Sequence, residues 1–148
     1  MLFNGSHPKD SFSRLDEDYA NWRREESPES SSTKGLHEYD DKLNMRSIED
    51  YKRIKTICQG FGQRAKKLHE KGEFKDDAEK YYLEVIQLEA DYCSQGIDKK
   101  GYLMSELDFR SGIQAQLPRW FARPSFFKLE NIEDYDAALS RLKMIPKR

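Results

Sequence analysis

Apolar residues recur at helical spacing in several stretches of the chain. Residues 47–71 carry a seam with steps of four and three positions: Ile54, Cys58, Phe61, Ala65 and Leu68. The next stretch carries a second seam, Phe74, Ala78, Tyr81, Val85, Leu88 and Tyr92, which Tyr82, Ile86 and Cys93 widen. A third seam consists of Ile132, Tyr135, Leu139 and Leu142. Each set falls on one face of an α-helix, so we expect these faces to point into a core.

Local signals mark where these helices begin and end. Ser47 can cap a helix, and Asp50 follows three residues later in the first turn, where a carboxylate is favourable. Gly72 is a suitable stop for that helix, and Gly96 for the helix after it. Because the connection around Gly72 is short, residues 47–95 are predicted to form an antiparallel αα-hairpin.

The segment after the hairpin is less regular. Leu103 and Leu107 indicate a short helix at about 102–109, and a C-terminal helix is expected at 132–143. Between them lies an aromatic segment, residues 117–127, in which Pro118 and Pro124 disfavour a regular helix. We expect an extended aromatic strap there, which either covers the open side of the hairpin or anchors a partner. No alternating run indicates a sheet, so residues 47–148 are predicted to be a small all-α helical bundle.

The N-terminal 46 residues have a different composition. They hold ten acidic and seven basic side chains and a Ser-rich stretch without periodicity, which is typical of a disordered tail. One helical face interrupts the tail, at residues 12–22: Phe12, Leu15, Tyr19 and Trp22. This face either docks on the chain's own core or folds on a partner protein.

Residues 61–92 resemble a single helix pair of the tetratricopeptide type. Ala65 and Leu68 precede a turn formed by Gly72, Glu73 and Phe74, and the next helix places Ala78, Tyr82, Val85 and Leu88 as such pairs do. The segment is similarly close to the first two helices of a microtubule-interacting and trafficking (MIT) domain. It also resembles the C-terminal homology domain of super elongation complex scaffolds. These resemblances imply a helical surface for binding other proteins rather than a catalysed reaction.

Composition and charge narrow the class of protein. Apolar and charged residues each make up 36% of the chain, which is polar enough to suggest a small core. Residues 47–72 carry a net charge of +4 and residues 73–95 a net charge of −5, so the two helices can neutralise each other. No run approaches 18 apolar residues, and the N-terminus lacks the pattern of a secretory signal. Cys58 and Cys93 lie within apolar patterns, so we expect buried free thiols in a reducing, intracellular compartment.

Motifs for catalysis are not found. The sequence has no phosphate-binding glycine loop, no nucleophile elbow and no Cys/His cluster for a metal. Asp76, Asp77 and Glu79 lie at the start of a helix, where carboxylates complement the helix dipole. We therefore expect a protein that is not an enzyme and uses no cofactor or metal.

The sequence favours a protein-interaction subunit of a larger intracellular assembly. Nuclear transcription or chromatin machinery is the preferred setting, because the tail is acidic and Ser-rich. The alternatives are a nucleic-acid-binding module and an MIT-like adaptor in membrane trafficking. The side chains expected to bind a partner are the aromatic ones of the strap and the tail: Trp120, Phe121, Phe126, Phe127, Tyr19 and Trp22. The phosphorylation candidates are Ser27, Ser30, Ser31 and Ser32.

Overall fold

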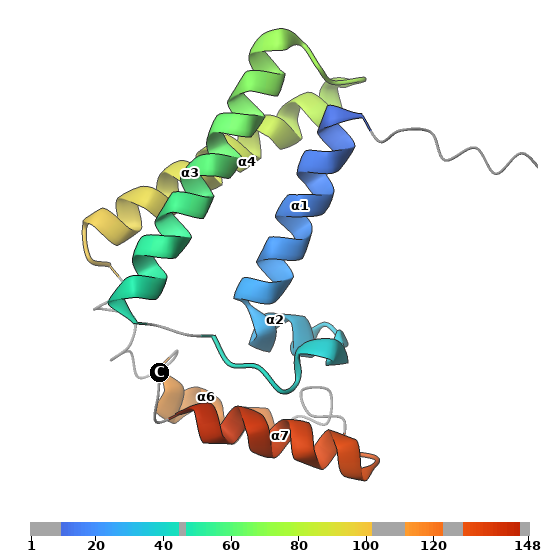
Figure 1. Cartoon of the computed structure of the whole chain (residues 1–148), viewed down its shortest axis with the longest axis vertical. Helices are drawn as coiled ribbons and strands as arrows, with labels where there is room; N and C mark the ends of the chain where they lie inside the picture. Colours follow the sequence, from blue (N-terminus) through green and yellow to red (C-terminus); the bar gives the residue numbers. More distant parts are fainter. Residues whose placement is uncertain (1–9, 45–46, 102–111, 123–128, 146–148) are drawn as a thin grey trace, which may run out of the picture.

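The computed structural model of the chain describes residues 10–44, 47–101, 112–122 and 129–145 (Figure 1). Every regular element within these ranges is a helix, so the all-α prediction is confirmed. The elements are α1 (Ser11–Glu26), α2 (Pro28–Thr33), the 3-10 helix η1 (His37–Tyr39), α3 (Ile48–Lys71), α4 (Asp77–Asp98), α6 (Ile113–Ala122) and α7 (Ile132–Met144). The helix expected at 102–109 lies outside the described residues.

The two longest helices, α3 and α4, pack along each other and run in opposite directions (Figure 1). Ser47 and Asp50 form a capping box at the start of α3, and Gly72, at φ 69°, ends it in the left-handed conformation that glycine adopts without strain. Gly96 does not end α4, which continues to Asp98. An interior glycine costs a helix only about 1 kcal/mol, which neighbouring turns can absorb.

Close contact between α3 and α4 depends on Gly62. A Cβ atom at this position would lie 2.7 Å from the Cβ of Ala90 on α4, which is too close for two carbon atoms. Around this crossing, Phe61 and Ala65 of α3 and Ile86 of α4 are buried in the main core. The missing side chain at Gly62 therefore lets the two backbones approach.

A disulfide joins the same two helices. Cys58 of α3 and Cys93 of α4 are bonded, and their Cα atoms lie 6.5 Å apart. The prediction of two free thiols is therefore wrong. Helical spacing within one segment cannot show that two cysteines on different helices will face each other, because that depends on how the helices are rotated.

Helix α1 packs against α3 and α4 and completes the core. Leu15 and Tyr19 are buried there, and the ring of Phe12 meets the ring of Tyr82 edge-on, with centroids 6.0 Å apart. The expected disorder of residues 1–46 is thus wrong for the helical parts of residues 10–44. The apolar face of residues 12–22, which the sequence pattern indicates, docks on the chain's own core, the first of the two alternatives given for it.

Ion pairs line the contact between α1 and the other two helices. Asp18 lies 2.7 Å from Arg64, Glu26 binds Arg53 at 2.9 Å, and Asp10 at the start of α1 binds Lys75 at 2.6 Å. Pairs at the protein surface add little net stability because water screens them, so apolar burial is the main interaction that holds α1. The basic side chains of α3 are therefore partly neutralised by α1, and not by α4 alone.

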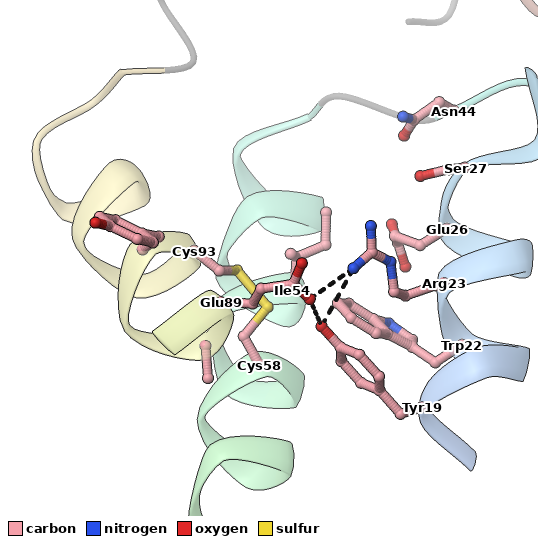
Figure 2. A pocket seen from close by; sticks show the side chains of 12 residues that line it. Tyr19, Trp22, Arg23, Glu26, Ser27, Asn44, Ile54, Cys58, Glu89 and Cys93 are labelled. Atoms are coloured by element: carbon pink, nitrogen blue, oxygen red, sulfur yellow. Dashed lines mark hydrogen bonds and ion pairs between the residues drawn. A yellow bond between two sulfur atoms is a disulfide. The ribbon is translucent and has the colours of Figure 1, made fainter. Parts of the chain in front are cut away.

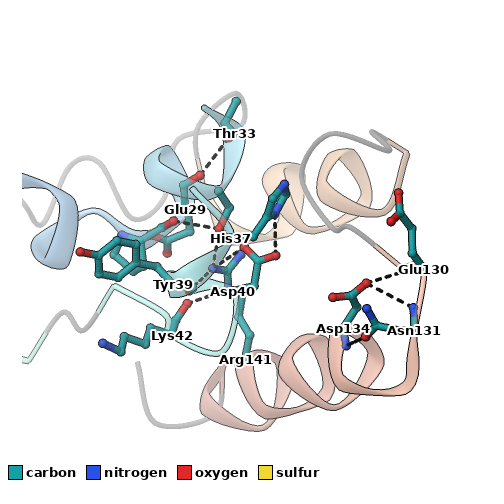
Figure 3. A network of polar contacts seen from close by, with 12 residues as sticks. Glu29, Thr33, His37, Tyr39, Asp40, Lys42, Glu130, Asn131, Asp134 and Arg141 are labelled. Atoms are coloured by element: carbon teal, nitrogen blue, oxygen red, sulfur yellow. Dashed lines mark hydrogen bonds and ion pairs between the residues drawn. The ribbon is translucent and has the colours of Figure 1, made fainter. Parts of the chain in front are cut away.

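The C-terminal helix α7 is fixed by one buried arginine (Figure 3). The Arg141 side chain is fully buried. Its Nη2 donates hydrogen bonds to Ser32 Oγ at 2.8 Å and to the Tyr39 carbonyl. Its Nε donates a hydrogen bond to the Lys42 carbonyl at 2.6 Å. The carboxylate of Asp40 lies 3.8 Å from its Nη2. Burial lowers the pKa of Arg141, whereas the nearby Asp40 carboxylate raises it and so favours the charged guanidinium. The contacts of this guanidinium with Ser32, Tyr39, Asp40 and Lys42 hold α7 on the α2–η1 segment.

A second small core lies beside this arginine. Trp120 of α6, Leu43 and Ala138 of α7 are buried together. The prediction of an extended strap at 117–127 is therefore wrong for Leu117–Ala122, which belong to α6 and include Pro118. A proline inside a helix costs about 3 kcal/mol, whereas burying a tryptophan stabilises by roughly 4–6 kcal/mol at about 25 cal/mol per Å².

Two glycines on α3 provide a test of the helix crossing. Gly62→Ala should lower the free energy of unfolding by about 1–3 kcal/mol, because the added methyl group overpacks the contact with Ala90. Gly60→Ala is the matched control: its added Cβ meets nothing within 4 Å, so it should stabilise the protein by roughly 0.5–1 kcal/mol. Urea unfolding measures both variants, and a Gly62→Ala protein as stable as Gly60→Ala contradicts this account of the crossing.

Arg141→Met should lower the free energy of unfolding by about 3–5 kcal/mol, because it removes the buried guanidinium from Asp40, leaving that carboxylate only His37 as a basic neighbour among the described residues, and breaks the bonds to the Tyr39 and Lys42 carbonyls. The matched control is Lys143→Met, an exposed position on the same helix, with an expected change within about 0.5 kcal/mol. In a Trp22→Phe background Trp120 is the one tryptophan, since the chain has two, so excitation selective for tryptophan reports on Trp120. The emission maximum of Trp120 should shift to the red in Arg141→Met but not in Lys143→Met, because Trp120 becomes exposed to water when α7 detaches. The same emission maximum in both variants would contradict this account.

Candidate functional site

The side of α4 that faces away from the core carries a row of large apolar side chains. Tyr81, Val85, Leu88 and Tyr92 are 60%, 46%, 53% and 67% exposed. On the opposite side of the helix, Leu83 and Ile86 are fully buried and Ala90 is 6% exposed. We call the exposed set the outward stripe.

The outward stripe is the face that the sequence predicts to be buried, so that prediction is wrong for its four residues. Helix α4 is apolar on two faces, and helical spacing alone does not show which face meets the core. The close contact of Ala90 with Gly62 settles the rotation, because only a small side chain fits at that crossing. The larger side chains are left on the outside.

One edge of the outward stripe is acidic. Asp77, Glu84 and Asp91 are all exposed beside it, and Glu84 lies 3.1 Å from Nε2 of His69 on α3. We call these three residues the acidic edge. The position of Asp77 at the start of a helix predicts only an interaction with the helix dipole, whereas the seven-residue spacing of Asp77, Glu84 and Asp91 in the sequence indicates one shared edge.

The other edge of the stripe is covered by α1. Glu89 accepts hydrogen bonds from the Tyr19 hydroxyl and from Nη1 of Arg23, the latter at 2.6 Å. Burial raises the pKa of Tyr19 to about 12, and the bond to Glu89 adds to the shift. Burial alone would raise the pKa of Glu89, but the bonds from Tyr19 and Arg23 outweigh it and lower that pKa. This side of α4 is thus satisfied within the chain.

A cavity of about 380 Å³ lies between α1, α3 and α4, as Figure 2 shows. Its walls include Trp22 and Ile54, the Cys58–Cys93 disulfide, and the polar cluster of Arg23 and Glu89. Tyr92 of the outward stripe also lines it. The cavity therefore borders the stripe, and its size lies within the range of sites that hold a small molecule or one large side chain.

A second exposed apolar row lies on α7. Ile132, Tyr135 and Leu139 are 76%, 54% and 51% exposed, on the side away from the buried Ala138 and Arg141. This row is shorter than the outward stripe. It corresponds to the third apolar seam of the sequence, whose expected burial is therefore also wrong for these three residues.

Three of the aromatic residues expected to bind a partner, Tyr19, Trp22 and Trp120, are not part of the outward stripe. Tyr19 is buried and Trp22 half-buried, and both rings pack on Phe61 of the chain's own core. Trp120 is buried, 7% exposed, in the second core. Phe121 belongs to α6, and Phe126 and Phe127 lie outside the described residues. Partner binding through Tyr19 or Trp120 is thus not supported, since their rings are already covered.

The phosphorylation candidates also separate. Ser31 and Ser32 are buried, and their hydroxyls donate to the carbonyl of Arg24 and to the Asp40 carboxylate. Their burial in the folded chain disfavours phosphorylation at these two positions. Ser30 is exposed and Ser27 half-buried, so these two stay predictions.

The described residues offer few features of other functional classes. Among them, no group of three or more His, Cys, Asp or Glu side chains is placed to hold a metal ion. In the same part of the chain, no helix is both long and apolar enough to cross a membrane. No protein-family model, curated protein or solved structure matches the chain.

Proposed function

We propose that this chain is a non-enzymatic protein-interaction subunit that binds another protein through the outward stripe. The observation that carries the proposal is the exposure of four large apolar side chains in one line on α4, each between 46% and 67% exposed. Contiguous exposed apolar surface with aromatic members is typical of protein interfaces.

The stripe is also held rigidly. Helix α4 is packed along α3 and linked to it by the Cys58–Cys93 disulfide, and Glu89 ties it to α1. A partner therefore binds without first ordering this helix, which removes a large part of the entropic cost of association. Fully burying one such side chain stabilises by about 1.5–3 kcal/mol, and roughly half of that is still to be gained at each stripe residue.

The alternatives from the sequence receive less support. A nucleic-acid-binding module would stack bases on the rings of Trp120 and Phe121, and the ring of Trp120 is buried with Leu43 and Ala138. An MIT-like adaptor would use the same helical surface and differs in its cellular setting. A disulfide is typical of oxidising compartments and speaks against a nuclear setting, so the proposal concerns protein binding and names no compartment.

The test is affinity purification of the tagged full chain from cells that express it, followed by quantitative mass spectrometry. The double variant Val85→Glu with Leu88→Glu should recover its main partner at least about tenfold less than the wild type, because 1.4 kcal/mol already corresponds to a factor of ten. Both positions are exposed, so thermal stability should be unchanged.

Leu139→Glu on α7 is the matched control, since Leu139 is as exposed as Leu88 but lies outside the stripe. It should recover the partner as well as the wild type does. A double variant that still recovers the same partner in full, or a wild-type chain that purifies alone, would refute the proposal.

A further inference from the structure

The exposed side of α4 has the spacing of a coiled-coil seam. Six exposed positions step by three and four residues along it: Ala78, Tyr81, Val85, Leu88, Tyr92 and Gln95. Five of the six are apolar. An apolar seam with a period of 3.5 residues faces a second helix over its whole length, which is the pattern of a coiled coil.

Acidic residues repeat beside this seam at intervals of seven. The acidic edge of Asp77, Glu84 and Asp91 continues to Asp98, and all four side chains are exposed. Asp77, Glu84 and Asp91 directly precede Ala78, Val85 and Tyr92, which is the heptad position that sets partner choice through charge in coiled coils. Asp98 binds Lys55 at 2.5 Å and Glu84 meets His69, so the edge stays anionic where Asp77 and Asp91 lie.

The opposite heptad edge is occupied by this chain. Its positions are Tyr82, Glu89 and Gly96; Phe12 of α1 packs on Tyr82, while Tyr19 and Arg23 of α1 bind Glu89. A second helix on the seam therefore meets α1 on one side and the acidic edge on the other. Specificity by charge can act only along the acidic edge.

A second copy of this chain does not fit the seam. In a parallel pair of α4 helices, Glu84 of one copy would face Glu89 of the other, and in an antiparallel pair the two acidic edges would face each other. On α7, Glu133 and Asp136 lie beside the exposed apolar row and Lys143 is the one exposed cation, so α7 of a second copy offers the acidic edge no line of cations. Like charges facing across a helix pair are destabilising.

We propose that α4 forms a two-helix coiled coil with a helix of another protein that carries Lys or Arg along the edge facing Asp77, Glu84 and Asp91. The inference rests on the proposed function and adds the chemistry of the partner to it. The apolar positions of that helix cover the outward stripe, and its cations replace the water around the acidic edge.

The test uses the full chain and synthetic three-heptad peptides with aliphatic residues at the seam positions. One peptide carries Lys at the flanking positions and the other Glu; like charges keep each from pairing with itself. At low salt, wild-type chain should bind the Lys peptide at least about tenfold more tightly than the Glu peptide. Glu84→Lys with Asp91→Lys should reverse this preference, since both side chains are exposed and circular dichroism can confirm that the fold is kept.

The controls separate this inference from simple charge attraction. Val85→Glu with Leu88→Glu should abolish binding of the Lys peptide, and so should replacing the peptide's aliphatic residues with Ser. Binding that survives either change, an absence of charge preference, or a dimer of the chain that the Val85 and Leu88 changes dissociate would each overturn the inference.

Recovery of the natural partner with the two double variants distinguishes the inference from the proposed function. A partner lost with Val85→Glu and Leu88→Glu but fully retained with Glu84→Lys and Asp91→Lys leaves the proposed function standing and refutes a basic helix. A partner lost with both pairs of changes supports both.

Discussion

The contact between Gly62 and Ala90 is the constraint on which the rest of the fold depends. Because a Cβ atom at Gly62 would lie 2.7 Å from that of Ala90, α3 and α4 can approach only with these two positions opposed. This fixes the rotation of α4, places Leu83 and Ile86 in the core, and brings Cys58 and Cys93 within bonding distance. The same rotation leaves the outward stripe in solvent.

Helix α1 then decides how much of α4 stays accessible. Its apolar face covers the core between α3 and α4, and Tyr19 and Arg23 close one edge of α4 through Glu89. Arg141 plays the corresponding part at the other end of the chain, where it joins α7 to the segment that follows α1. Among the described residues, the longer of the two exposed apolar rows is the outward stripe of α4, which has one acidic edge and is the surface on which we propose that a partner helix binds.

Some of this follows from the sequence because it is local. The cap at Ser47 and the stop at Gly72 depend on residues within four positions of them, and each lies at an end of α3. What could not be predicted depends on contacts between distant segments. To predict these contacts one must know which surfaces meet, and this holds for the rotation of α4, the disulfide, the docking of α1 and the helix around Pro118. For α4 the sequence alone is not enough, because the helix has two apolar faces and either could point into the core.

The most direct measurement of the central claim is oxidative footprinting of the isolated chain, with residue-level mass spectrometry of α4. The account predicts strong labelling of Tyr81, Leu88 and Tyr92 and protection of Leu83 and Ile86, in keeping with their exposure. Protection of Tyr81 and Leu88 together with labelling of Leu83 and Ile86 would contradict it, because α4 would then have the opposite rotation and no outward stripe.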